Sequence, residues 1–216
     1  MSNFKNHLIQ VLKGELPALD AQLQMAPEFR KEELLKQKSD LKIKNSAVLI
    51  LFNPFAENLS IVFTKRSSRL NIHRGQVSFP GGRVDAADRD ATATALRETW
   101  EEIGIPSSQI EIIGQLSNLY IPPTSFDVRV MLGFLKSKPI YKINPDEVEE
   151  VVEVPISQLM DPSNIKSKVF YKTNSNLNRK APYYDVMGLE IWGATAMIIS
   201  ELLVCIKPFY NQPNKD

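Results

Sequence analysis

The sequence predicts an α/β protein in which helices flank one mixed β-sheet. Short apolar runs that are typical of strands outnumber the two long segments with helical periodicity. Strands and helices do not alternate regularly, which argues against a doubly wound parallel sheet. The 216 residues, 43% hydrophobic and 24% charged, suit one globular domain with an appendage.

Residues 1–44 are predicted to form an N-terminal helix and a polar arm. The helix is indicated by apolar residues at helical spacing, Phe4, Leu8, Val11 and Leu12. Gly14 and Pro17 end it. Residues 18–44 are polar and lysine-rich, so we expect them to be solvated and to carry no chemistry. The apolar stripe of the helix must be buried either on its own domain or on a partner chain, and the second arrangement would make the protein a homodimer.

Residues 45–210 are predicted to form the main domain, and residues 211–216 a polar tail. Ala47–Phe52 is a continuous apolar run, which suits a strand buried on both faces, and Leu59–Thr64 follows after a loop of hairpin length. Further strands are expected at Ile110–Leu116, Val128–Leu135, Glu150–Val154 and Tyr183–Val186. Helices are expected at Ala91–Ile103 and Thr195–Ile206, with a short helix after Pro155.

Charge and cysteine content exclude several classes of function. The 26 basic and 25 acidic residues give a net charge of +1, so we expect no nucleic-acid or membrane partner. Cys205 is the only cysteine, which rules out an intrachain disulfide and a cysteine-cluster zinc site. No apolar run approaches the length of about 20 residues that spans a bilayer. The first residues do not resemble a signal peptide, and a cytoplasmic location is expected.

The helix expected at Ala91–Ile103 carries the most informative pattern. Asp90 can cap its start and Gly104 can end it. Its apolar stripe, which we expect to face the core, consists of Ala93, Leu96, Trp100 and Ile103. The carboxylates expected to converge on the opposite side are those of Glu98, Glu101 and Glu102.

Two interpretations of these carboxylates compete. The first is a solvated acidic face, and the second is a site for Mg²⁺ or Mn²⁺, which take oxygen ligands and accompany phosphate substrates. The Gly81-Gly82 turn before the helix favours the metal site, because it lets a backbone carbonyl approach the same ion. Asp88 adds one more carboxylate, and Arg97 can pair with a glutamate and hold its rotamer.

The stretch from Gly82 to Ile105 resembles the Nudix box. That box is a glycine, five residues, an acid, seven residues, Arg-Glu, an apolar residue, any residue, Glu-Glu, any residue, a glycine and an apolar residue. The matching positions are Gly82, Arg97, Glu98, Glu101, Glu102, Gly104 and Ile105. Asp88 stands where the acid is usually glutamate, eight residues rather than seven separate it from Arg97, and Thr99 replaces an apolar residue.

The flanking residues resemble the coenzyme A pyrophosphatase subgroup of the Nudix family. Upstream of the box, Thr64, Arg66, Ser67, Gly75 and Phe79–Gly82 match the extra motif of that subgroup, whereas Asn71 occupies the place of its second arginine. Stretches at 144–151 and 191–196 are also similar, so the resemblance covers about residues 45–206. A cationic segment here would provide counter-charge for a substrate with a 3′-phosphate as well as a diphosphate.

The resemblance implies an α/β/α sandwich with a mixed sheet, in which the box forms a loop–helix–loop. It implies Mg²⁺- or Mn²⁺-dependent cleavage of coenzyme A or a derivative into 3′,5′-ADP and 4′-phosphopantetheine. The metal ligands it implies are Glu98, Glu101, Glu102 and the Gly82 carbonyl. Arg97 would orient the carboxylates, and the general base would be Glu101, with Glu147 as a second candidate. The substrate-binding residues would be Arg66, Ser67, Arg69, Arg74 and Gly81.

Two alternatives to this function remain at the level of sequence. The substrate could be another nucleotide diphosphate, such as a nucleoside triphosphate, an ADP-sugar or a dinucleotide. In a different class, the domain could be a ligand-binding sensor without catalysis. The intact acids Glu98, Glu101 and Glu102 argue against a sensor, because sensor domains tend to lose their metal ligands.

Overall fold

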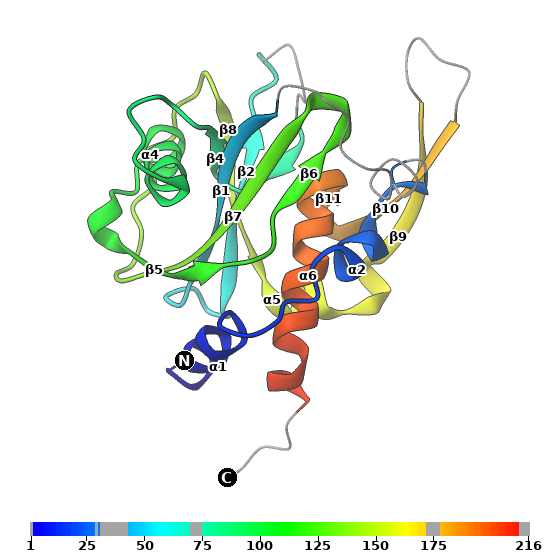
Figure 1. The fold of residues 1–216 in the computed structure, drawn as a ribbon, viewed down its shortest axis with the longest axis horizontal. Coiled ribbons are helices and arrows are strands. Elements are labelled where there is room, and N and C mark those ends of the chain that lie inside the picture. Colours follow the sequence, from blue (N-terminus) through cyan, green and yellow to red (C-terminus); the bar gives the residue numbers. More distant parts are fainter. Residues whose placement is uncertain (1, 29, 31–42, 70–74, 172–177, 212–216) are drawn as a thin grey trace.

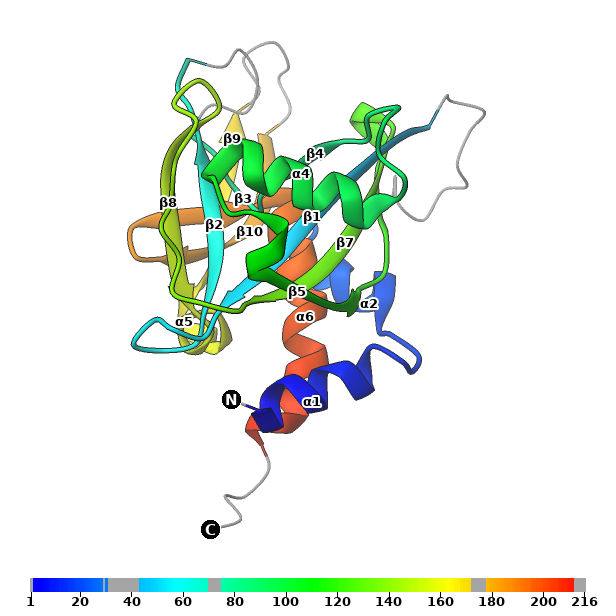
Figure 2. The same cartoon turned by 90° about the vertical axis from the view of Figure 1, so that its left-hand side faces the viewer.

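A computed structural model describes residues 2–28, 30, 43–69, 75–171 and 178–211. A central sheet lies between helix α4 (Ala91–Ile103) on one face and helix α6 (Gly193–Tyr210) on the other, as Figure 1 and Figure 2 show from two directions. The expected α/β/α sandwich with a mixed sheet is confirmed.

The order of strands in the central sheet is β3-β2-β1-β7-β5, with β4 paired to β1, β6 to β7 and β8 to β2. Strand β1 is antiparallel to β2 and parallel to β7, so the sheet is mixed. The bounds of these strands are β1 Lys44–Asn53, β2 Ser60–Arg66, β3 Val77–Ser78, β4 Gly81–Arg83, β5 Ile110–Gln115, β6 Leu119–Ile121, β7 Phe126–Leu135 and β8 Val148–Pro155.

Strand β1 is buried on both faces, as its continuous apolar run predicts. Because successive side chains of a strand point to opposite faces, Leu49 and Leu51 join the core beneath α4, whereas Ile50 and Phe52 join the core beneath α6. The two cores together fix the sheet between the helices.

A second sheet, in the order β11-β10-β9, leads into α6. Its strands are β9 Ile165–Tyr171, β10 Asn178–Val186 and β11 Leu189–Trp192, and the short helix α5 (Ile156–Met160) precedes it. The single-turn 3-10 helices are η1 Leu23–Met25, η2 Ser107–Gln109, η3 Pro122–Thr124 and η4 Pro162–Asn164. All the predicted strands and helices are present. The strands that periodicity missed (β3, β4, β6, β9 and β11) are very short or carry lysines within their apolar pattern.

Helix α6 comes closer to a membrane-spanning length than the sequence analysis expected. Among the described helices, it is the one whose length and apolar composition would allow it to cross a membrane. Most of it is buried inside the protein, as is typical of a core helix.

The apolar stripe of helix α1 (Ser2–Val11) is buried on its own chain, which is the first of the two arrangements considered. Phe4 and Leu8 are buried, and the Phe4 ring lies edge-on against Phe52 and Phe209, with ring centroids 5.9 Å and 5.4 Å away. As Figure 1 shows, α1 lies beside the C-terminal end of α6.

The expectation that residues 18–44 are solvated is wrong for residues 18–26. Helix α2 (Ala18–Gln22) and η1 lie against α6, where Gln22 Nε2 donates to the buried Glu201 carboxylate at 2.7 Å and Ser200 Oγ donates to the Ala21 carbonyl at 2.7 Å. The apolar residues between positions 19 and 26 were obscured by averaging with the lysine-rich stretch that follows. That stretch, residues 31–42, lies outside the described residues.

Candidate metal centre and active site

Helix α4 begins and ends where its sequence predicts. The Asp90 carboxylate accepts a hydrogen bond from the Ala93 backbone N–H at 2.8 Å, which caps the first turn. Gly104 ends the helix with left-handed backbone at φ 73°, a conformation that glycine adopts without steric cost. These two ends fix which turns of the helix carry its acidic residues.

The buried face of α4 differs from the predicted apolar stripe. Ala95, Thr99 and Ile103 are buried with Glu102, whereas Trp100 is 58% exposed. Thr99 tolerates burial because its hydroxyl donates to the Ala95 carbonyl at 2.6 Å within the helix. The helix is therefore rotated so that one of its carboxylates, that of Glu102, enters the interior.

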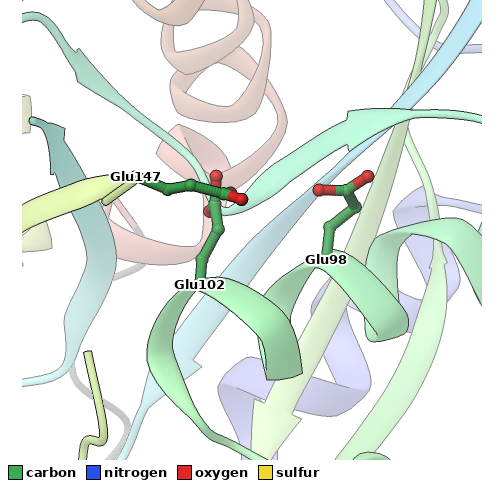
Figure 3. Close-up of side chains that lie close together, drawn as sticks. All are labelled: Glu98, Glu102 and Glu147. Atoms are coloured by element: carbon green, nitrogen blue, oxygen red, sulfur yellow. The ribbon is translucent and has the colours of Figure 1, made fainter. Parts of the chain in front are cut away.

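Three carboxylates converge between α4 and the loop before β8. They belong to Glu98 and Glu102 of α4 and to Glu147, and one oxygen from each lies within 4.8 Å of the others. Figure 3 shows Glu147 pointing from its loop toward the two helix residues. Of the predicted trio, the structure brings Glu98 and Glu102 together with Glu147, whereas Glu101 is outside this cluster and pairs with Arg97 at 2.9 Å.

Burial makes this cluster unfavourable without a cation. Glu102 is only 3% exposed, and burial raises the pKa of its carboxyl to about 8, with a hydrogen bond from the Gly81 N–H at 3.3 Å partly offsetting the effect. Burial likewise raises the pKa of Glu98, against the opposing influence of Arg97. A divalent cation that prefers oxygen ligands fits this donor set, because it would neutralise the converging charges.

The NUDIX domain model matches residues 42–174 of this chain. The chain belongs to the Nudix family. It is 32% identical to Nudix hydrolase 3 of Caenorhabditis elegans over 163 residues, which cover 69% of this chain and 68% of that protein. It is 36% identical to the uncharacterized Nudix hydrolase NudL of Citrobacter koseri over 150 residues, which cover 68% and 74% of the two chains.

A solved structure supports the fold. The MutT protein from Methanosarcina mazei Go1 is 18% identical, with a TM-score of 0.51 over 81% of this chain and 100% of that chain. With the named relatives, the family assignment makes the protein an enzyme, a Nudix hydrolase of the pyrophosphatase type. Nudix hydrolases generally use divalent metals, and the acidic cluster suits one.

The glycine of the Nudix box allows the metal cluster to lie against the sheet. Gly82 pairs with Ala47 of β1, and a Cβ added to it would lie 2.5 Å from both carboxylate oxygens of Glu98. At Gly81, with φ 153°, an added Cβ would lie 2.6 Å from the Val48 Cα. Gly82 thus makes room for a candidate ligand, whereas Gly81 makes room for the neighbouring strand.

The arginine of the Nudix box connects the acid before the helix to the acids on it. Asp88 accepts from Arg97 Nε at 3.0 Å and Nη2 at 2.8 Å, and from the Thr94 hydroxyl at 2.8 Å. The guanidinium holds the pKa of the Asp88 carboxyl well below its usual range. Arg97 Nη1 also donates to Glu98 and Glu101, at 2.9 Å each. Despite the extra residue in the spacing, Asp88 therefore positions Arg97 and lies outside the cluster.

The predicted substrate-binding residues are distributed unequally around the Nudix box. Arg66, at the end of β2, lies close enough to Glu102 to oppose the rise in its pKa, and its buried Nε has no hydrogen-bond partner among the described residues. Ser67 is buried, and its N–H donates to the Glu147 carbonyl at 2.9 Å. Arg69 is exposed; its guanidinium lies 3.4 Å from the carboxylate of the exposed Asp146, and its backbone N–H donates to Ser67 Oγ at 3.3 Å. Arg74 and Asn71 lie outside the described residues.

The structure also reveals a cavity that the sequence analysis missed. It has a volume of about 880 Å³, and Glu101 and Glu147 line it. Trp100, which the helical pattern placed in the core, lines it too. The signal in the sequence would have been that Trp100 stands at the position of the Nudix box where any residue is allowed, between Thr99 and Glu101.

Proposed function

We propose that the protein hydrolyses the diphosphate linkage of coenzyme A or a derivative, giving 3′,5′-ADP and 4′-phosphopantetheine, with Mg²⁺ or Mn²⁺. The observation that carries the proposal is the place of Arg66. This residue belongs to the motif that resembles the coenzyme A subgroup, and its buried Nε has no partner beside the acidic cluster. A phosphate oxygen would satisfy that donor.

The position of Arg66 favours the diphosphate as its ligand. The cationic segment was predicted to provide counter-charge for the 3′-phosphate as well as for the diphosphate, and Arg66 lies within electrostatic reach of Glu102. A phosphate next to the cluster belongs to the linkage that is cleaved. The 3′-phosphate then requires another partner.

Glu98, Glu102 and Glu147 would hold the metal, and Arg97 would keep Glu98 and Glu101 in place. A metal bound there would polarise the diphosphate and lower the pKa of the attacking water. Glu101 is our first choice of general base, because its carboxylate is 41% exposed and lies outside the cluster. Glu147, the second candidate, faces the other two acids, which suits a ligand better than a base.

A hydrolysis assay on a small panel tests this proposal. Coenzyme A, ADP-ribose and a nucleoside triphosphate are each incubated with the full chain, with and without Mg²⁺ or Mn²⁺, and the products are identified. We expect the highest kcat/KM for coenzyme A and no turnover without metal. Preferred cleavage of another substrate would support the broader alternative of a different nucleotide diphosphate. Binding without cleavage of any panel member would support the sensor alternative.

Two variants refine the assay. Arg66→Ala should lower kcat/KM for coenzyme A and for 3′-dephospho-coenzyme A alike, by about 1.5–3 kcal/mol of transition-state stabilisation for a hydrogen bond to a charged group. Glu57→Gln, which removes an exposed acid far along the sequence from the box, is the control and should be neutral. A loss confined to the 3′-phosphorylated substrate would show that Arg66 binds the 3′-phosphate instead of the diphosphate.

A further inference from the structure

The cavity beside the metal cluster extends around the C-terminal end of α4. Glu147 lies in its wall near the cluster, and Trp100, Lys138, Ile140 and Lys142 line it farther away. At about 100° per residue, Trp100 lies on the far side of the helix from Glu98. An extended ligand is therefore needed to occupy both the metal centre and the distal end of the cavity.

The distal end presents an open aromatic surface. Trp100 is 58% exposed and Ile140 is 78% exposed, although both are large apolar side chains. Within the described part of the protein, the Trp100 ring stacks on no other ring and its indole N–H has no hydrogen-bond partner. A solvent-exposed indole in the wall of a cavity is suited to stacking with a planar ligand group.

Two lysines, Lys138 and Lys142, line the same cavity. Among the described residues, neither Lys138 nor Lys142 has an ion-pair or side-chain hydrogen-bond partner. The segment that carries them is fixed to α4, because the Lys142 N–H donates to the Ile103 carbonyl and the Asn144 N–H to the Glu102 carbonyl, each at 2.9 Å. The backbone of Lys142 is thus held against the end of α4, and two lysines without an ion-pair partner among the described residues line the same cavity as Trp100, which suits an anion.

We propose that this cavity binds the nucleotide half of the substrate, with its base stacked on Trp100 and a phosphate on its ribose bound by Lys138 and Lys142. The inference rests on the proposed function, because it assumes that the diphosphate lies at the acidic cluster. A pantetheine chain carries neither an aromatic ring nor a negative charge, so it would use neither feature. A nucleotide with a ribose phosphate uses both.

Ligand binding without turnover tests the inference. The probes are 3′,5′-ADP and 5′-AMP with Mg²⁺, and the readouts are calorimetry and tryptophan fluorescence, which is informative because the chain has only two tryptophans. We expect 3′,5′-ADP to quench the fluorescence of the wild type, and Trp100→Phe to remove the quenching while binding persists. Trp100→Ala should weaken both probes about tenfold through the lost stacking.

The lysines are tested with the double variant Lys138→Gln and Lys142→Gln. It should weaken 3′,5′-ADP about tenfold and leave 5′-AMP unchanged, because only the first probe has the ribose phosphate. Phe55→Ala, at an exposed aromatic residue elsewhere, and Lys180→Gln, at an exposed lysine of β10, are the matched controls and should bind like the wild type.

The outcomes distinguish failure of the nucleotide-binding inference from failure of the proposed function. Wild-type affinity for 3′,5′-ADP in the Trp100→Ala and lysine variants, or no binding by the wild type, would overturn the inference. Substrate cleavage by the wild type is measured in parallel on the panel described above. Failure of the wild type to cleave any nucleotide diphosphate would reject the proposed function, whatever the binding variants do.

Discussion

Replacing Gly82 with alanine tests whether the absence of a side chain at this position makes room for the candidate metal ligand Glu98. The new Cβ would lie 2.5 Å from both carboxylate oxygens of Glu98, whereas ordinary contacts begin near 3.4 Å, so the carboxylate must retreat by about 1 Å. A displacement of that size in a catalytic group costs roughly 100-fold in rate. The clash involves the flexible end of a side chain, and Gly82 does not have left-handed backbone. We therefore expect a stability loss of no more than about 1 kcal/mol, or about 2–4 °C in Tm.

The assay measures kcat over a range of Mn²⁺ concentrations, together with the Tm of the metal-free protein. Gly14→Ala is the matched control, because Gly14 also lacks left-handed backbone and its added Cβ would make only an ordinary contact, 3.5 Å from the Val11 carbonyl. Turnover of Gly82→Ala within twofold of the wild type would refute the reasoning. So would a fall in Tm well beyond the expected range, since it would show that the strain lies in the backbone.

Three further predictions follow from the helix and from the buried N-terminus. Glu101→Gln should keep the Tm within about 2 °C, because only an exposed ion pair is lost, and should lower kcat about 100-fold or more; near-native turnover at saturating Mg²⁺ would exclude Glu101 as ligand and as base. Because burial raises the pKa of Glu102 from 4.5 to about 8, the metal-free folded state keeps a proton that the unfolded chain loses above pH 4.5. Stability in EDTA should therefore fall by up to about 1.4 kcal/mol per pH unit between pH 5 and 8, and Glu102→Gln should reduce this slope; an unchanged slope would contradict the raised pKa. Leu8→Ala should cost about 2–5 kcal/mol of stability with kcat intact, while Ile9→Ala, at a half-buried neighbour, costs less; equal melting temperatures would show that the stripe of α1 is not buried as described.

Much of the fold could be predicted because its signals are local. The apolar run at Ala47–Phe52 indicated a strand with two buried faces, and Asp90 and Gly104 marked the two ends of α4, all of which the structure confirms. The spacing of the Nudix box likewise identified Glu98 and Glu102 as neighbours on one helix. Each of these features depends on residues within a few positions of one another.

The burial of individual residues was harder to predict. Trp100 was expected in the core and is exposed, whereas Glu102 and Thr99 are buried. The hydrophobicity of Trp100 predicted that its side chain would be buried. Strand β4 instead lies close to Glu98 at Gly82 and donates to Glu102 from the Gly81 N–H, so the helix turns these two acids toward the sheet. The buried contacts of α2 were missed for a related reason, since its partners Ser200 and Glu201 lie about 180 residues away in the chain.

The sequence by itself determined the long strands and helices, the caps of α4, the family and the acidic helix, because periodicity, turn residues and motif spacing are properties of neighbouring residues. Only the tertiary structure decided which carboxylates meet. Glu147 enters the cluster from a loop 45 residues beyond Glu102, whereas Glu101, one residue before Glu102, lies outside it and pairs with Arg97. Position along the chain limits which side chains share a helix face, but the packing of a distant loop against that face determines which oxygens lie close enough to share an ion.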